Sequence, residues 1–146
     1  MTLDDSIVLA QGIASGAMCG IVWFVQVVHY PLFASRGGDE RAYALENRAR
    51  TARVVIPFML AEGVAATVIA WAPPPGIPRV AAVAGLALVA AAWLSTALVQ
   101  MPLHARLARE GHVADVVAAL VRSNRLRTVI WSLRAALAAW MLRVAA

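Results

Sequence analysis

Two polar clusters end two apolar runs of this chain, at residues 23–31 and 93–104. Each contains a tryptophan, then a glutamine, then a histidine and a proline within four residues of one another. Histidine can act as an acid or a base near neutral pH, and glutamine can orient a ligand by hydrogen bonds. Polar groups at membrane depth are costly and usually functional. Two matching clusters therefore predict one shared site that holds and deprotonates a small molecule.

The composition shows which elements must position these clusters. The chain has 146 residues, of which 62% are hydrophobic and 14% are charged. Four apolar windows are each long enough to cross a hydrocarbon core of about 30 Å. They cover residues 6–28, 53–71, 80–101 and 126–142. We therefore predict an all-α integral membrane four-helix bundle, with residues 1–146 as a single transmembrane domain in contact with the lipid bilayer.

The charge pattern predicts the orientation of this bundle. All thirteen basic residues are arginine, and ten of them fall in residues 36–53 and 106–127. By the positive-inside rule, both Arg-rich loops are cytoplasmic and both termini lie outside. Within these loops we expect amphipathic segments at residues 39–50 and 113–125. Because the charge is segregated by loop, we expect no nucleic-acid partner. The four apolar windows predict a multi-pass protein, which we place in a bacterial cytoplasmic (inner) membrane.

Proline positions divide the chain into two helical hairpins. Pro31 and Pro102 are predicted to end the first and third helices, and Pro57 to lie in the first turns of the second helix, where proline is least disruptive. The proline-rich stretch 72–78 is short, so the second and third helices should be antiparallel neighbours.

Small residues suggest where helices pack closely. Gly12, Gly16 and Gly20 recur at four-residue spacing in the first helix, a pattern that lets helix backbones approach. We expect a seam there, either within the chain or between copies in a homo-oligomer. Cys19 is the only cysteine, which excludes an intrachain disulfide and a cysteine metal cluster.

Two charges lie near the middle of the predicted spans. Glu62 is in the second span and Arg134 in the fourth. A lone charge at that depth costs roughly 2.5–3.5 kcal/mol on insertion scales, so we predict that the two side chains pair inside the bundle. The pair could serve only to fix helix packing, or it could take part in function, and the sequence favours neither.

A polar stripe on the fourth helix should face the same interior. Its members are Asn124, Arg127, Thr128, Trp131 and Arg134. Gln26 and His29 are three residues apart, and therefore on one face of the first helix. Gln100 and His104 are four apart, and share a face if the third helix continues past Pro102. These groups predict a polar pocket that opens toward the cytoplasm.

Each member of this pocket has a predicted role. Glu62 and Arg134 would form its floor. His29 or His104 would be the catalytic acid or base, while Arg127 and Arg134 would stabilise an oxyanion. The ligand-binding residues would be Gln26, Glu62, Gln100, Asn124, Thr128 and Trp131. The alternative is that the polar groups only cap helix ends and bind lipid phosphates.

The sequence requires no cofactor, but the histidines leave two options open. His29, His104 and Glu62 could form a metal site of two histidines and one carboxylate, although no local spacing resembles a metal motif. A haem held by His29 and His104 between the first and third helices is the other option. His112, the third histidine, is expected in a loop.

The motifs of the third and fourth helices resemble those of a small four-span membrane family with bacterial members that includes fungal anthrone oxygenases. The matching residues are Trp93, Thr96, Pro102, His104, Leu107, Arg127 and Thr128. Residues 26–31 are similar to that family's polar-residue-then-proline ending of the first helix. The resemblance implies an oxidoreductase that converts a lipophilic phenolic substrate to a quinone.

The sequence thus predicts an intramembrane pocket for a small lipophilic aromatic or quinone-like molecule, and leaves open whether the pocket also oxidises it. One alternative is a non-catalytic small transporter or accessory subunit that assembles through Gly12, Gly16 and Gly20. A second alternative is a membrane protein that binds haem or a metal.

Overall fold

The computed structural model describes residues 2–34, 40–111 and 114–145 of the chain. These residues form helices and no strand, so the predicted all-α class is confirmed for the described part of the chain. Four helices are long and apolar enough to cross a membrane: Leu3–Leu32, Arg41–Trp71, Arg79–Glu110 and Ala114–Ala145. By these criteria the protein is a multi-pass membrane protein. His112 lies outside the described residues.

Two of the four helices are interrupted by a π-helical turn. The first helix consists of α1 (Leu3–Phe24), the π turn η1 (Val25–His29) and α2 (Tyr30–Ala34). The second is α3 (Glu40–Trp71). The third consists of α4 (Arg79–Ser95), the π turn η2 (Thr96–Gln100) and α5 (Met101–Glu110). The fourth is α6 (Ala114–Ala145).

The two π turns correct the prediction that Pro31 and Pro102 end their helices. A proline inside an α-helix has no N–H to donate and its ring clashes with the carbonyl four residues back. A π turn widens the backbone just before each proline, so both helices continue beyond it. In each π turn the N–H donates to a carbonyl five residues back, from Tyr30 to Val25 and from Met101 to Thr96.

Pro57 also differs from its predicted place. It lies inside α3 rather than in the first turns of a helix, because α3 already begins at Glu40. The polar segment 39–50, which was expected to be a separate element, is therefore continuous with the second spanning helix from Glu40 onward. The segment 113–125 forms the beginning of α6 from Ala114 onward, so the prediction that the last helix extends upstream of its membrane span is confirmed.

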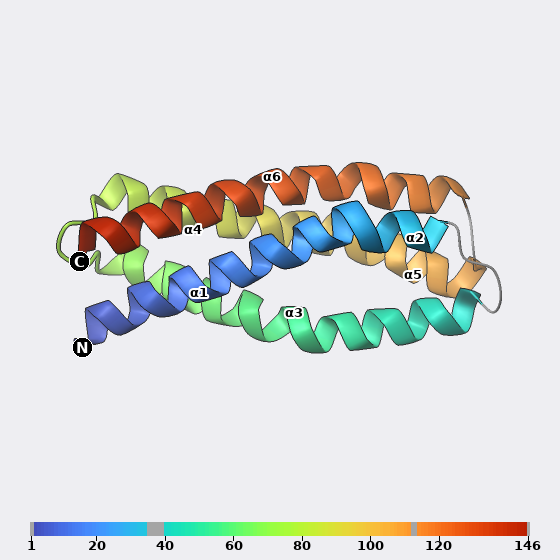
Figure 1. The fold of residues 1–146 in the computed structure, drawn as a ribbon, viewed down its shortest axis with the longest axis horizontal. Helices are drawn as coiled ribbons and strands as arrows, with labels where there is room; N and C mark the ends of the chain where they lie inside the picture. The colour runs from blue at the N-terminus through green and yellow to red at the C-terminus, as the bar shows by residue number, and fades with distance from the viewer. Residues whose placement is uncertain (1, 35–39, 112–113, 146) are drawn as a thin grey trace.

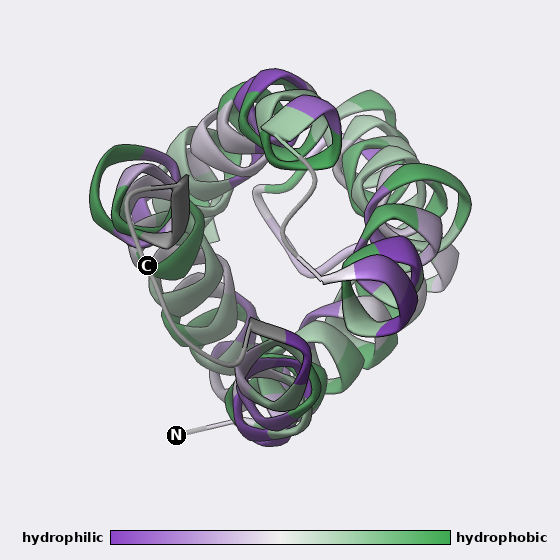
Figure 2. Ribbon diagram, turned by 90° about the vertical axis from the view of Figure 1, so that its right-hand side faces the viewer, coloured by the Kyte–Doolittle hydropathy of each residue, from purple (hydrophilic) through white to green (hydrophobic). Residues whose placement is uncertain are grey.

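The four helices surround one axis (Figures 1 and 2). Within the described residues, α1 approaches α3 and α6, and α4 approaches the same two helices. The cyclic order is therefore α1, α3, α4, α6, with α3 and α6 at opposite corners. The predicted contact of the second and third helices is confirmed. Their connection contains Gly76 at φ 83°, a backbone conformation that favours glycine.

The two ends of the bundle differ in composition. Both chain termini lie at one end (Figure 1), which we call the terminal end. At the opposite end, α2 and α5 finish and α3 and α6 begin, and the ribbon facing the viewer in Figure 2 is strongly hydrophilic there. We call this the Arg-rich end.

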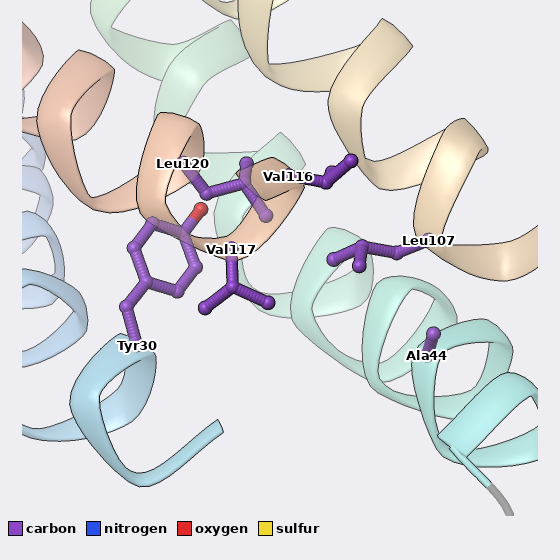
Figure 3. Packing of buried hydrophobic residues seen from close by; sticks show 6 residues of the cluster. All are labelled: Tyr30, Ala44, Leu107, Val116, Val117 and Leu120. Atoms are coloured by element: carbon purple, nitrogen blue, oxygen red, sulfur yellow. The ribbon is translucent and has the colours of Figure 1, made fainter. Parts of the chain in front are cut away.

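Three apolar layers fill the bundle. At the terminal end, Val8, Ile69, Ile77, Ala82 and Met141 pack together. The middle layer, called here the Trp131 layer, consists of Met18, Val22, Ala92 and Trp131. At the Arg-rich end, the layer shown in Figure 3 consists of Tyr30, Ala44, Leu107, Val116, Val117 and Leu120. These layers hold the polar groups between them at defined positions.

Only one of the three glycines predicted to form a seam is covered within the chain. A Cβ added at Gly12 would collide with the side chain of Leu142 on α6, whereas one added at Gly16 or Gly20 would meet nothing within 4 Å. The intrachain seam is therefore limited to Gly12. A contact between copies through Gly16 and Gly20 stays a prediction.

Candidate functional site

A cavity of about 280 Å³ lies among the four helices toward the Arg-rich end. Its apolar wall contains Ile21, Val22, Val25, Ala52, Val55, Ile56, Met59 and Met101. Its polar wall contains His29, Tyr30, Asn47, Arg48, Thr51, Thr96, Gln100, His104 and Arg127. This mixture of apolar surface and converging polar groups is typical of small-molecule sites.

The π turns determine which polar residues face this cavity. Thr96 and Gln100 are the first and last residues of η2, and His104 follows one turn later in α5. All three line the cavity, so the expectation that Gln100 and His104 share a face is confirmed. His29, the last residue of η1, lines it as well.

Gln26 does not line the cavity with His29, although the two were expected on one face. A π turn closes its hydrogen bonds five residues back rather than four, so residues three apart no longer point the same way. Gln26 turns instead toward α6, where its Oε1 accepts a hydrogen bond of 3.1 Å from Asn124 Nδ2.

Asn124 organises a supporting layer behind the cavity. Its Nδ2 also donates to the carbonyl of Val22 at 3.4 Å, and its Oδ1 accepts from Arg127 Nη1 at 3.3 Å. The Thr128 hydroxyl donates to the Asn124 carbonyl at 2.9 Å. Asn124 and Thr128 are buried and do not line the cavity. Their predicted ligand-binding role stays a prediction; in the structure Asn124 contacts Arg127, and Thr128 contacts Asn124.

Arg127 brings an uncompensated positive charge to the cavity. Arg127 is only 8% exposed, and no carboxylate of the described residues lies within ion-pairing distance of its guanidinium. Its Nε has no hydrogen-bond partner among the described residues. Arg48 is a second cation on the wall, and none of the described residues that line the cavity is an aspartate or a glutamate. The cavity therefore favours a ligand with an anionic or ionisable oxygen, because opposite charges attract strongly where water is scarce.

Tyr30 connects the two histidines. Its hydroxyl is 3.1 Å from His104 Nε2, and which atom donates depends on the imidazole tautomer. The Tyr30 ring centroid lies 5.9 Å from that of His29 and 6.0 Å from that of His104. Sequence reasoning did not select Tyr30, although it stands beside Pro31 in the first cluster.

Gln100 presents an acceptor without a protein partner. Its Nε2 donates to the Ser123 hydroxyl at 2.9 Å, while its buried Oε1 has no hydrogen-bond partner. Buried polar groups are nearly always hydrogen-bonded, so this oxygen is suited to accept an O–H from a ligand. The half-buried Ser123 hydroxyl holds Gln100 in place through this hydrogen bond.

No comparison with family models, curated proteins or solved structures finds a match to this chain. The resemblance to the anthrone oxygenase family therefore rests on its short motifs. Thr96, His104 and Arg127 of those motifs line the cavity. Trp93 does not: it packs on Gly63 of α3, where an added Cβ would lie 2.9 Å from its Cζ2.

A second polar site lies deeper in the bundle. Arg134 Nε is 2.5 Å from Glu62 Oε1, and both side chains are completely buried, which confirms the predicted pair. The buried Ser15 hydroxyl lies beside the Glu62 carboxylate. Gly85 leaves room for the guanidinium, because a Cβ there would be 3.3 Å from Arg134 Nη1. The pair joins α3 to α6 across the bundle, with Ser15 of α1 and Gly85 of α4 beside it.

The expectation that Glu62 and Arg134 form the floor of the cavity is wrong. Neither residue lines it, and neither does Trp131. Met59 of α3 both lines the cavity and packs on the Trp131 layer, and Glu62 follows one helical turn later. The bulky apolar layer therefore separates the cavity from the deep pair. Every predicted residue of the α6 stripe is nevertheless buried, as expected.

The predicted metal set is not assembled. Within the described residues, no three histidine, cysteine, aspartate or glutamate side chains lie close enough to hold a metal ion, because Glu62 is bound to Arg134 below the Trp131 layer. The haem option also fits poorly. His104 Nε2, the nitrogen that would bind iron, is engaged with the Tyr30 hydroxyl.

The cavity wall on α3 was missed by sequence reasoning. Asn47, Arg48 and Thr51 were assigned to a cytoplasmic loop, yet they stand on the first turns of α3 and line the cavity. The Thr51 hydroxyl is 3.5 Å from Asn47 Oδ1. Extending the helical spacing of the second span upstream of Arg53 would have placed them on one face.

Proposed function

We propose that this membrane protein binds a small lipophilic molecule with a phenol-like or quinone-like oxygen in the cavity between η1, α3, η2 and α6. The observation that carries the proposal is the charge of the wall. Arg127 and Arg48 line a cavity whose surface is mostly apolar, and none of its described lining residues carries a carboxylate. An apolar ring would fill the space, and its oxygen would lie against the arginines.

The polar wall supplies groups for both states of such an oxygen. The Gln100 Oε1 can accept the O–H of a phenol or quinol. His104 can accept the proton when that oxygen ionises, either directly or through Tyr30, whose hydroxyl passes its own proton to His104 Nε2 as it takes that of the ligand. The buried Arg127 then stabilises the resulting anion.

Substitution of Arg127 tests the proposal. We use 4-ethylphenol as the probe and measure its binding to protein in lipid nanodiscs by calorimetry, with empty nanodiscs as the reference for partitioning. Loss of a hydrogen bond to a charged group weakens binding by about 1.5–3 kcal/mol, or roughly tenfold or more. We expect that loss for Arg127→Gln.

Arg125→Gln is the matched control, because Arg125 is an exposed arginine on the same helix. Its affinity for 4-ethylphenol should equal that of the unmodified protein. Absence of saturable binding to the unmodified protein, or an equal loss in both variants, would reject the proposal. Analysis of the probe after aerobic incubation shows in the same samples whether it is also oxidised.

A further inference from the structure

A groove on the outer surface adjoins the cavity. It has a volume of about 490 Å³ and runs between the first helix and α3. The groove and the cavity share six lining residues: Ile21, Val25, His29, Asn47, Thr51 and Val55. The two spaces therefore adjoin along one wall made of these side chains, and the π turn η1 forms part of both.

The outer part of the groove faces the surroundings of the bundle and is apolar. It is bordered by Phe24 of α1 and Val54 of α3, both of which are exposed. Gly20 lies between them in the lining, and a Cβ added there would meet nothing within 4 Å. A glycine at this position keeps the outer groove wide. All three residues belong to helices long and apolar enough to span a membrane.

We propose that this groove admits the ligand sideways from the bilayer and holds its chain. The ligand class is an amphiphile, with a hydroxylated or quinonoid ring against Arg127 and a hydrocarbon chain in the groove between α1 and α3. The inference rests on the proposed function, since it assumes that the ring occupies the cavity. It adds the route of access and the requirement for a chain-bearing ligand.

Two physical arguments support this occupant. The cationic Arg127 is buried on the inner side of these adjoining spaces, and the apolar Phe24 and Val54 are exposed on the outer side, which matches the polarity of such an amphiphile. Hydrocarbon gains little by leaving lipid tails for an apolar protein surface. The groove should therefore provide access for the chain rather than affinity, and blocking it should exclude only ligands with a chain.

Two glycines of α1 provide a matched test. Gly20 lines the groove, whereas Gly16 does not, and both are exposed with open space around their Cβ positions. We compare Gly20→Trp with Gly16→Trp in nanodiscs. The probes are 4-ethylphenol, for the ring alone, and 4-dodecylphenol with a photoreactive diazirine at the end of the chain.

In the unmodified protein, the diazirine should label the segments around Phe24 and Val54, as located by mass spectrometry. The indole introduced by Gly20→Trp would occupy the groove, so it should reduce this labelling by about tenfold or more, which corresponds to about 1.4 kcal/mol or more. Gly16→Trp should leave the labelling unchanged. Both variants should bind 4-ethylphenol as the unmodified protein does. If Gly20→Trp does not fold, Gly20→Leu and Val54→Trp provide the same test.

The outcomes separate this inference from the proposed function. If 4-ethylphenol does not bind the unmodified protein, the proposed function fails and the inference with it. If 4-ethylphenol binds but the two tryptophan variants label equally, the inference alone is overturned. Labelling on α4 or α6 would also overturn the inference, because the hydrocarbon chain of the probe would then lie elsewhere. Crosslinks between two copies of the protein would overturn it as well, because a second copy would then cover the groove.

Discussion

Two arginines on one face of α6 illustrate how neighbouring residues take different roles. Arg134 is completely buried and is neutralised by Glu62 at 2.5 Å. Arg127, two turns away, has no carboxylate within ion-pairing distance among the described residues and lines the cavity. The charge of the first is therefore satisfied within the bundle, whereas under the proposed function the second offers its charge to a ligand.

This difference predicts a stability effect at Arg134. Arg134→Met leaves the Glu62 carboxylate buried without its partner, which in soluble proteins costs about 3–5 kcal/mol. Replacing both residues by apolar ones, as in Glu62→Met with Arg134→Met, should recover most of that loss. Unfolding in mixed micelles by titration with sodium dodecyl sulfate, followed by circular dichroism, measures both values.

The exposed pair of Glu46 and Arg50 serves as the control. It is also formed between α-helical residues, at 2.6 Å, but water screens it. Arg50→Met should leave the unfolding midpoint nearly unchanged. An equal effect of the two arginine substitutions, or a double variant as unstable as Arg134→Met, would contradict the assignment of the deep pair to bundle stability.

At the scale of elements, the π turns explain why both polar clusters face the interior. Each turn places one extra residue in the helix before a proline, and the helix continues beyond it. In both turns the first and the last residue line the cavity: Val25 and His29 in η1, and Thr96 and Gln100 in η2. The repeated cluster is therefore one structural device used twice, with different side chains exposed to the cavity.

This geometry predicts an asymmetry between deletions in the third helix. Deletion of the exposed Val99 together with Pro102→Ala should convert η2 to a regular α-helix, while the same residues of α5 continue to face the cavity. Deletion of the exposed Ala90 together with Pro102→Ala should rotate all later residues of this helix by about 100°. His104 would then leave the cavity.

The two deletion variants are compared by their unfolding midpoints and by 4-ethylphenol binding. The Ala90 deletion should be the less stable of the two and should bind no probe, whereas the Val99 deletion should retain a midpoint close to that of Pro102→Ala alone. Equal loss in both deletions would show that η2 is not an inserted residue in an otherwise regular helix.

At the scale of the molecule, the bundle has a polarity along its axis. Both termini are at one end, and the arginine-bearing starts of α3 and α6 are at the other (Figure 1). The cavity lies toward the Arg-rich end, and the deep pair lies beyond the Trp131 layer. The positive-inside rule predicts that the Arg-rich end faces the cytoplasm.

Single cysteines test this orientation. In a Cys19→Ser background, Thr2→Cys marks the terminal end and Arg109→Cys marks the Arg-rich end, since both positions are exposed. A maleimide that cannot cross membranes should label Thr2→Cys in intact cells. It should label Arg109→Cys only after the cells are lysed. The reverse pattern would show that the bundle has the opposite orientation.

Much of the architecture followed from local patterns in the sequence. Apolar windows identified the four helices, because burial of charge in hydrocarbon is costly for any arrangement of the chain. The same argument paired Glu62 with Arg134, and the helical spacing of polar residues identified the buried face of α6. These are properties of single helices and of the solvent around them, and they do not depend on which helices are neighbours.

The division of the polar groups into two sites was decided only by the tertiary structure. No spacing indicates that Trp131 and Met18 fill the space between Arg127 and Arg134, or that a π turn directs Gln26 toward Asn124 and His29 toward the cavity. Packing of side chains from different helices is a non-local effect. A proline is compatible with a helix that ends, kinks or widens, and the surrounding bundle decides which of these occurs. The sequence by itself therefore determined a membrane bundle with polar clusters inside, while the fold determined which of those clusters can meet a ligand.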